Sequence, residues 1–192
     1  IRKAIIDGRN EILNTMPSFV GGPLLYDDQF IIPQEAVGSF MLYALRRMSV
    51  EELAQLPDVG EGFENVLYRA ARSARTIEGF LEAVKSKRYT LARCRRITAC
   101  ARLGITSDQV RQTTSSREGS YLRVLGFQKT ARPLLGEMAR RRTMPMFVRN
   151  NDLDGCSPMV RRNVETDSLS TDILCFATDR DLKRDLSGPV IL

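Results

Sequence analysis

The amino-acid sequence predicts a mainly α fold with a small two-stranded β element. Apolar residues recur at helical spacing along most of the 192 residues. Ser and Thr, which cap helix N-termini, stand directly before several of these stretches. Two short runs, 120–127 and 144–148, are instead typical of strands. Because both flank a helix expected at 130–142, we predict a small strand–helix–strand unit.

The expected helices follow one another along the chain. The apolar run at 36–48 indicates a buried helix, and Ser49 with Glu52 forms a capping-box pattern that opens a short helix. Further helices are expected at 63–74, 77–86, 91–103, 130–142 and 158–177. Thr90 is placed to cap the third of these, and Gly104 is placed to end it. Ser107 and Asp108 indicate a further short turn.

The two ends of the chain are expected to be organised differently from its middle. The N-terminal segment has helical spacing and stops near Pro17. The stretch at 17–33 is rich in Gly and Pro and is typical of a loop. We therefore expect 1–16 to be an appendage and 17–192 to be the main domain. The chain begins with Ile, so we expect a piece of a longer protein.

The composition excludes several classes of site. There is no His, which rules out Ser-His-Asp and Cys-His catalysis and zinc sites that use His. No run of about 18 apolar residues is present, so no membrane span is expected. The N-terminus does not resemble a signal peptide. The cysteines form no CxxC motif and indicate free thiols in a reducing cytoplasm: Cys94, Cys100, Cys156 and Cys175.

Basic residues favour a polyanionic partner. The net charge is +6, and 85–102 contains seven cations and no acidic residue, which predicts an uncompensated positive cluster. The cluster consists of Lys85, Lys87, Arg88, Arg93, Arg95, Arg96 and Arg102. Loop cations beside a helix N-terminus suit phosphate groups. Tyr89 adds a ring of the kind that stacks on an unpaired base or packs in a core.

The same cluster has a simpler interpretation. At 100° per residue, one face of the helix at 91–103 is apolar and predicts its core stripe. That stripe consists of Leu91, Cys94, Ile97, Thr98 and Ala101. Arg95 and Arg102 flank it on one side and Arg93 on the other, whereas Arg96 lies nearer the opposite face. These arginines are therefore also placed to keep a packed helix soluble.

Two other charged groups also have interpretations that need no ligand. A second basic cluster ends the helix at 130–142, where cations complement the helix dipole. It consists of Arg132, Arg140, Arg141, Arg142 and Arg149. Glu61 and Glu64 stand near a helix start, where carboxylates are favourable, and are equally placed to anchor nearby arginines. If the fold brought the two basic clusters together, one long basic face would result.

Several stretches together resemble the bacterial tRNA(Met) cytidine acetate ligases. They are IRKAI at 1–5, VGEGFENVLYRAARSARTIEGFLEAVKSKRYTLARCRRI at 59–97 and SYLRVLGF at 120–127. The resemblance implies that the chain is the helical C-terminal part of a longer nucleotidyltransferase-type protein. Residues 1–16 would then end the nucleotidyltransferase-like domain, and 17–192 would form the tRNA-binding domain.

The resemblance also implies an activity for the full-length enzyme. Members use ATP to activate acetate as acetyl-adenylate and then acetylate the wobble cytidine of elongator tRNA(Met). Ile1 and Arg2 match the end of a Ser/Thr-x-Ile-Arg motif that holds the nucleotide, so Arg2 is an expected ATP contact. Mg²⁺ is a candidate companion of ATP. The HxGH motif of the family is absent, and we therefore expect these residues alone not to activate acetate.

The resulting hypothesis is a cytoplasmic tRNA-docking region. Its expected tRNA contacts are Lys85, Lys87, Arg88, Tyr89, Arg93 and Arg96. Two alternatives remain at this point. One is a helical protein-interaction or dimerisation module that uses the apolar helix at 36–48 or the terminal PVIL at 189–192. The other is an RNA-binding module unrelated to acetylation. A complete enzyme, with its own catalytic residues, is the least favoured.

Overall fold

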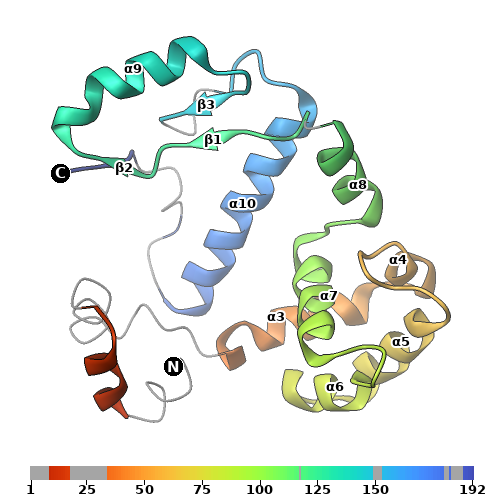
Figure 1. Ribbon diagram of the computed structural model, residues 1–192. Helices are drawn as coiled ribbons and strands as arrows, with labels where there is room; N and C mark the ends of the chain where they lie inside the picture. Colours follow the sequence, from red (N-terminus) through yellow and green to blue (C-terminus); the bar gives the residue numbers. More distant parts are fainter. Residues whose placement is uncertain (1–8, 18–33, 117, 149–152, 180–181, 183–187) are drawn as a thin grey trace.

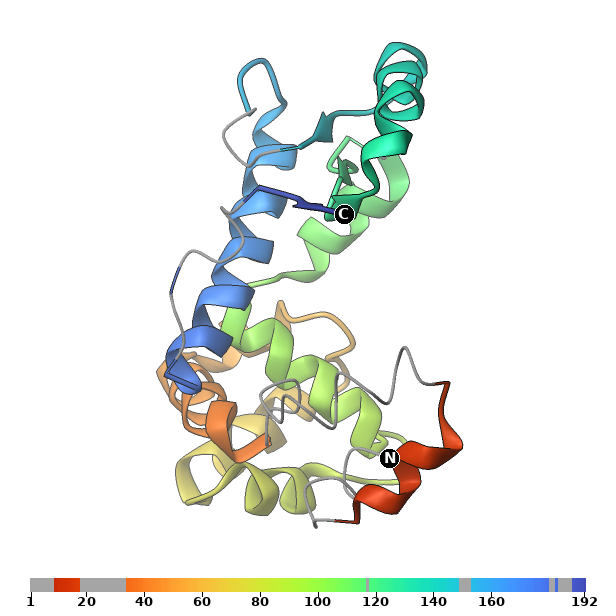
Figure 2. The same cartoon turned by 90° about the vertical axis from the view of Figure 1, so that its left-hand side faces the viewer.

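The computed structural model of the chain describes residues 9–17, 34–116, 118–148, 153–179, 182 and 188–192. The described part is mostly helical, with two small parallel sheets, which confirms the expected fold class. A cluster of helices lies at one end, a strand–helix–strand unit lies at the other, and a long helix runs between them (Figure 1). The view in Figure 2 shows the same elongated arrangement.

The elements described in the N-terminal half, at 9–17 and 34–116, are all helices. They are the 3-10 helix η1 (Asn10–Thr15) and the α-helices α3 (Gln34–Arg47), α4 (Val50–Ala54), α5 (Phe63–Ser73), α6 (Ile77–Val84), α7 (Leu91–Leu103) and α8 (Ser107–Ser116). The helices expected at 36–48, 63–74, 77–86 and 91–103 are therefore present. The segment at 107–116 is a helix of ten residues rather than a short turn. The Thr106 side chain accepts a hydrogen bond from the Gln109 amide at 3.3 Å and so supports its first turn.

The C-terminal half contains the strands and the long helix. The elements are β1 (Leu122–Arg123), β2 (Gly126–Phe127), η3 (Lys129–Ala131), α9 (Arg132–Arg141), β3 (Met146–Phe147), α10 (Pro158–Ala177) and β4 (Val190–Ile191). Strands β1 and β3 pair in parallel across α9, which confirms the strand–helix–strand unit. Strands β2 and β4 pair in the same sense, so the terminal apolar residues form a strand.

Local capping interactions place the helix boundaries. Ser49 and Glu52 form the expected capping box: the Ser49 hydroxyl accepts from the Glu52 amide, and the Glu52 carboxylate accepts from the Ser49 amide at 2.7 Å. The Thr76 hydroxyl accepts from an α6 amide at 3.1 Å, and the Thr90 hydroxyl from an α7 amide at 3.4 Å. Gly104 ends α7 in the left-handed conformation with φ 67°.

The main core is formed by the five helices α3, α4, α5, α6 and α7. Its fully buried side chains come from different elements and include Leu45, Leu53, Leu67, Phe80 and Ile97. The expected stripe of α7 is confirmed: Cys94, Ile97, Thr98 and Ala101 are buried and Leu91 packs at the edge. Helix α3 faces the same core, so it is not a free apolar patch. A Cβ on Gly38 would lie 2.6 Å from the Ile77 side chain, which shows how closely α3 and α6 approach.

Some expectations concern residues outside the described part. These are Arg2, Arg149, the N-terminal helix before residue 9 and nearly all of the loop at 17–33. The division into 1–16 and 17–192 remains a prediction. Within the described residues, no helix combines the length and the apolar character needed to cross a bilayer.

Candidate nucleic-acid interface

The loop between α6 and α7 presents three cations. Lys85 follows α6 as its C-cap residue, and Lys87 and Arg88 come next; all three are exposed. Two hydrogen bonds close the loop: the Ser86 amide donates to the Tyr89 carbonyl at 2.9 Å, and the Tyr89 amide donates to the Ser86 hydroxyl at 3.0 Å. The loop therefore holds its cations beside the N-terminus of α7.

Tyr89 belongs to the core. Its side chain is 6% exposed and its ring stacks on Phe63 with 3.5 Å between the ring centroids. Its hydroxyl donates to the Gly60 carbonyl at 2.8 Å. Of the two roles expected for this ring, the structure shows packing. A base has no open face of Tyr89 to stack on, because Arg93 lies over the ring with its guanidinium carbon 4.4 Å from the centroid.

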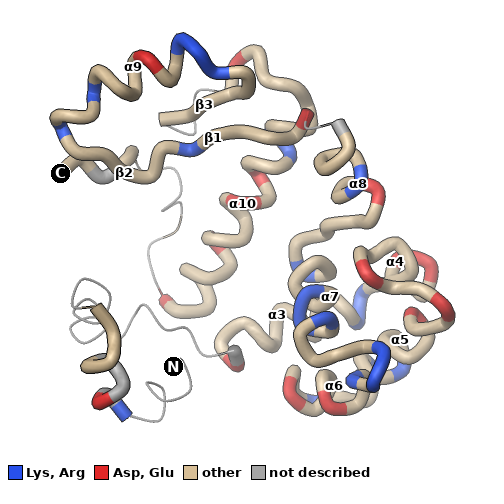
Figure 3. The backbone as a smooth tube through the Cα atoms, viewed as in Figure 1, with Lys and Arg blue, Asp and Glu red and all other residues tan. Residues whose placement is uncertain are grey.

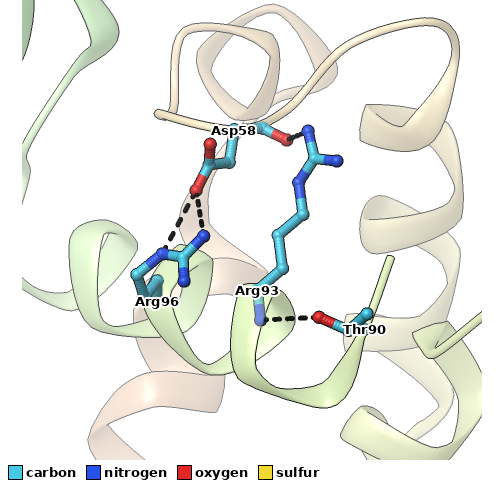
Figure 4. Close-up of polar contacts among 4 residues, drawn as sticks. All are labelled: Asp58, Thr90, Arg93 and Arg96. Carbon is cyan, nitrogen blue, oxygen red and sulfur yellow. Dashed lines mark hydrogen bonds and ion pairs between the residues drawn. The ribbon is translucent and has the colours of Figure 1, made fainter. Parts of the chain in front are cut away.

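Arg93 and Arg96 both bind Asp58, which lies in the turn between α4 and α5 (Figure 4). The Arg93 guanidinium donates to the Asp58 main-chain carbonyl at 2.7 Å. The Arg96 guanidinium donates twice to the Asp58 carboxylate, at 2.9 and 3.3 Å. Asp58 has φ 66°, a left-handed conformation that Asp tolerates better than most residues. These two arginines therefore fix the turn against α7.

Carboxylates also contact the loop cations. Arg88 forms an ion pair with Glu61, and Lys85 forms one with Glu82 at 2.6 Å. The hydrogen bond and charge of Arg88 lower the pKa of Glu61, and Glu61 raises the pKa of Arg88. Glu61 thus anchors an arginine, one of the two roles expected for it.

The expectation of an uncompensated cluster is therefore wrong. Three carboxylates, from Asp58, Glu61 and Glu82, contact its cations. All three acids lie outside 85–102: Glu82 stands three residues before Lys85, whereas Asp58 and Glu61 are brought to the cations by the fold. Only tertiary structure places these two acids there.

The cations remain accessible despite these ion pairs. The side chains of Lys85, Arg88 and Arg96 are 48%, 59% and 64% exposed. Lys87 and Arg95 are exposed, and their side chains form no hydrogen bond or ion pair with any other described residue. Arg102 is half-buried, and burial lowers its pKa. The loop and the first half of α7 thus carry five exposed cations, which are Lys85, Lys87, Arg88, Arg95 and Arg96. Arg95 is added by the structure to the tRNA contacts expected from sequence.

The second basic cluster lies at the other end of the molecule. Arg140 and Arg141 pair with Glu137 on α9, at 2.7 and 2.5 Å. Arg142 donates to the Met146 carbonyl at 3.1 Å. Figure 3 shows the basic segments of α9 and α7 far apart, and Figure 2 agrees. The two clusters therefore form no single basic face in the described part of the chain.

The comparison with protein families decides the classification. The family model described as HIGH Nucleotidyl Transferase matches residues 1–186. The chain belongs to the HIGH nucleotidyltransferase family. The family match confirms the nucleotidyltransferase-type resemblance inferred from sequence, although these 192 residues contain no His.

Curated relatives carry a more specific name. The tRNA(Met) cytidine acetate ligase of Alkaliphilus metalliredigens is 30% identical over 174 residues, which are 91% of this chain and 39% of the relative. The ligase of Acetivibrio thermocellus is 30% identical over 135 residues, which are 69% of this chain and 32% of that protein. This family member therefore spans well under half the length of the relatives it matches.

Solved structures confirm the fold. Apo TmcAL from Thermotoga maritima matches with a TM-score of 0.86 and 21% identity, over 100% of this chain and 49% of that one. A second form of that protein, bound with alpha-thio ATP, gives a TM-score of 0.86 and 22% identity over 50% of its chain.

Neither the expected ATP contact nor a cluster of metal ligands is found among the described residues. Arg2, the expected ATP contact, lies outside them. No group of three His, Cys, Asp or Glu side chains in the described part is arranged to hold a metal ion. We therefore derive no step through Mg²⁺ or ATP.

Proposed function

We propose that this chain is the tRNA-docking region of a tRNA(Met) cytidine acetate ligase. The full enzyme would use ATP and acetate to acetylate the wobble cytidine of elongator tRNA(Met). The names of the curated relatives support this activity. The alpha-thio ATP bound to TmcAL from Thermotoga maritima supports the use of ATP. The four free cysteines agree with a cytoplasmic protein.

The observation that carries the docking role is the set of exposed cations at the start of α7. Lys87 has no partner among the described residues, and Arg88 beside it is 59% exposed. Exposed ion pairs contribute little to stability because solvent screens them, so exchanging Glu61 for a phosphate costs Arg88 little. Phosphate accepts two parallel hydrogen bonds from a guanidinium, which makes the exchange favourable. Lys85, Arg93, Arg95 and Arg96 extend the same surface.

The chemistry would reside in the part of the longer relatives that this chain does not match. The chain has no His and so lacks the HxGH motif expected for nucleotide activation. We therefore propose that these 192 residues bind tRNA without activating acetate. Acetate-dependent exchange between ATP and pyrophosphate tests this point. Exchange at the rate of a full-length relative would contradict it.

A titration against tRNA tests the docking role. The chain is titrated with elongator tRNA(Met) and with a second tRNA, each at two salt concentrations. The double variant Lys87→Ala/Arg88→Ala should bind about tenfold more weakly, and its salt slope should fall by roughly 1.5, because each lost phosphate contact removes about 0.7–0.9. Arg111→Ala is the matched control, since Arg111 on α8 is also exposed and ion-paired, 2.8 Å from Asp108.

The outcomes separate docking from the alternatives. Salt-dependent binding that prefers tRNA(Met) supports the proposal. Equal binding of both tRNAs would assign the selection of tRNA(Met) to another part of the enzyme. An unchanged affinity of the double variant at both salt concentrations would exclude this surface.

A self-association module is the second candidate, and α9 favours it. This helix buries none of its residues, and it exposes Leu134 by 61% and Met138 by 44%. Sedimentation at high salt tests it, because apolar association survives salt whereas phosphate binding does not. A monomer at every concentration would exclude it.

A further inference from the structure

A second set of arginines gathers at the C-terminal ends of α3 and α5. All five side chains are exposed. In the described part of the chain none of them contacts a carboxylate. The set consists of Arg46, Arg47, Arg69, Arg72 and Arg75, and we name it the α3–α5 arginine face. It shares no residue with the loop and helix described above.

Hydrogen bonds hold the two helix ends together. The Arg46 side chain crosses from α3 to α5 and donates to the Ala71 carbonyl at 2.8 Å and to the Ala74 carbonyl at 2.5 Å. In the opposite direction, the Arg72 guanidinium donates to the Arg46 carbonyl at 3.3 Å. Arg47, the last residue of α3, and Arg75, which follows α5, therefore lie on two chain segments that the side chains of Arg46 and Arg72 bridge.

Capping explains only part of this set. Arg46 donates to main-chain carbonyls at the C-terminus of α5, whereas Arg69 and Arg72 donate to carbonyls one turn earlier in the same helix. Arg47 and Arg75 make no hydrogen bond or ion pair with another described residue. Each helix C-terminus carries a partial charge of about −0.5, so two of them offset only about one of the five positive charges. The helix dipoles therefore leave about four of these five positive charges without an offset.

An aromatic ring lies beside Arg47, one of the two cations without a hydrogen bond or ion pair among the described residues. The Tyr43 side chain is 63% exposed, and the guanidinium carbon of Arg47 lies 5.7 Å from its ring centroid. This geometry leaves most of the ring open to solvent, unlike that of the buried Tyr89. Cations that are free to bind phosphate, next to an open aromatic ring, are the groups that bind a single RNA strand.

We propose that the α3–α5 arginine face binds an unpaired strand of RNA. Arg47 and Arg75 contact successive phosphates, and Tyr43 stacks on an exposed base. Arg46 and Arg72 position these groups by locking the helix ends. The inference rests on the proposed function in taking RNA as the partner, and it adds a second contact surface to the loop before α7. The tRNA would then be held at two places on the helical cluster.

The test uses variants that leave the helix contacts in place. Arg47→Ala/Arg75→Ala removes two cations that form no hydrogen bond with described residues, so the fold should be retained. We expect binding of elongator tRNA(Met) to weaken about tenfold and the salt slope to fall by roughly 1.5. Tyr43→Ala should weaken binding about fivefold or more, and Tyr43→Phe should retain it, because stacking needs the ring alone. Arg111→Ala again serves as control, and circular dichroism verifies folding.

The outcomes distinguish this inference from the proposed function. If the unaltered chain binds no tRNA, the proposed function fails and the inference fails with it. If Lys87→Ala/Arg88→Ala weakens binding while Arg47→Ala/Arg75→Ala does not, only the inference is overturned. Polyglutamate serves as a second probe. If the arginine variant loses polyglutamate binding and keeps its tRNA affinity, the face binds an acidic protein and the RNA assignment is wrong.

Discussion

Replacing Tyr89 should destabilise the fold rather than remove an RNA contact. The ring is 6% exposed and stacked on Phe63, so Tyr89→Ala removes a buried aromatic side chain at a cost of about 3–5 kcal/mol. Tyr89→Phe keeps the stacked ring and removes the hydroxyl that donates to the Gly60 carbonyl at 2.8 Å. That change should cost about 1 kcal/mol, which corresponds to a decrease of roughly 2–4 °C in Tm for a chain of this size.

Urea unfolding followed by far-ultraviolet circular dichroism measures both changes, since the chain has no Trp to report by fluorescence. Tyr43→Ala is the matched control. The Tyr43 ring is 63% exposed, so this variant should stay within about 0.5 kcal/mol of the unaltered chain. A Tyr89→Ala variant that kept its unfolding midpoint and lost tRNA affinity would refute the assignment of Tyr89 to the core.

Three further predictions follow from single contacts. Asp58→Asn removes the carboxylate that binds an α7 arginine at 2.9 Å; tRNA affinity should rise about twofold to threefold in a titration, with a steeper salt dependence. Equal affinity would contradict this. Gly38→Ala should lower the free energy of unfolding, measured in urea, by about 1–3 kcal/mol, because the new Cβ would lie 2.6 Å from the Ile77 side chain. An unchanged unfolding midpoint would contradict the close contact between α3 and α6. Because Arg88 lowers the pKa of Glu61, the pair stabilises the fold above the ordinary glutamate pKa, and this contribution is lost as pH falls through the lowered pKa. The difference in unfolding midpoint between the unaltered chain and Glu61→Gln should therefore disappear at acid pH, and a difference that persisted there would have another origin.

Helix positions were predictable because their signals are local. A capping side chain contacts a main-chain amide three residues away, so Ser49, Thr76 and Thr90 indicate helix starts in any tertiary context. The buried stripe of α7 also follows from helical periodicity alone. The full length of helix α8 does not follow from the sequence, because its main buried side chain is Gln109, a polar residue that gives no apolar periodicity.

The candidate interface was only partly predictable, for a physical reason. Sequence by itself determined the mainly α fold, most helix starts, the surplus of cations and the family resemblance. Only the tertiary structure decided that Tyr89 packs on Phe63, that Asp58 reaches α7, and that the arginines at the ends of α3 and α5 meet. Electrostatic compensation and burial depend on distance in space, and the groups concerned are tens of residues apart along the chain.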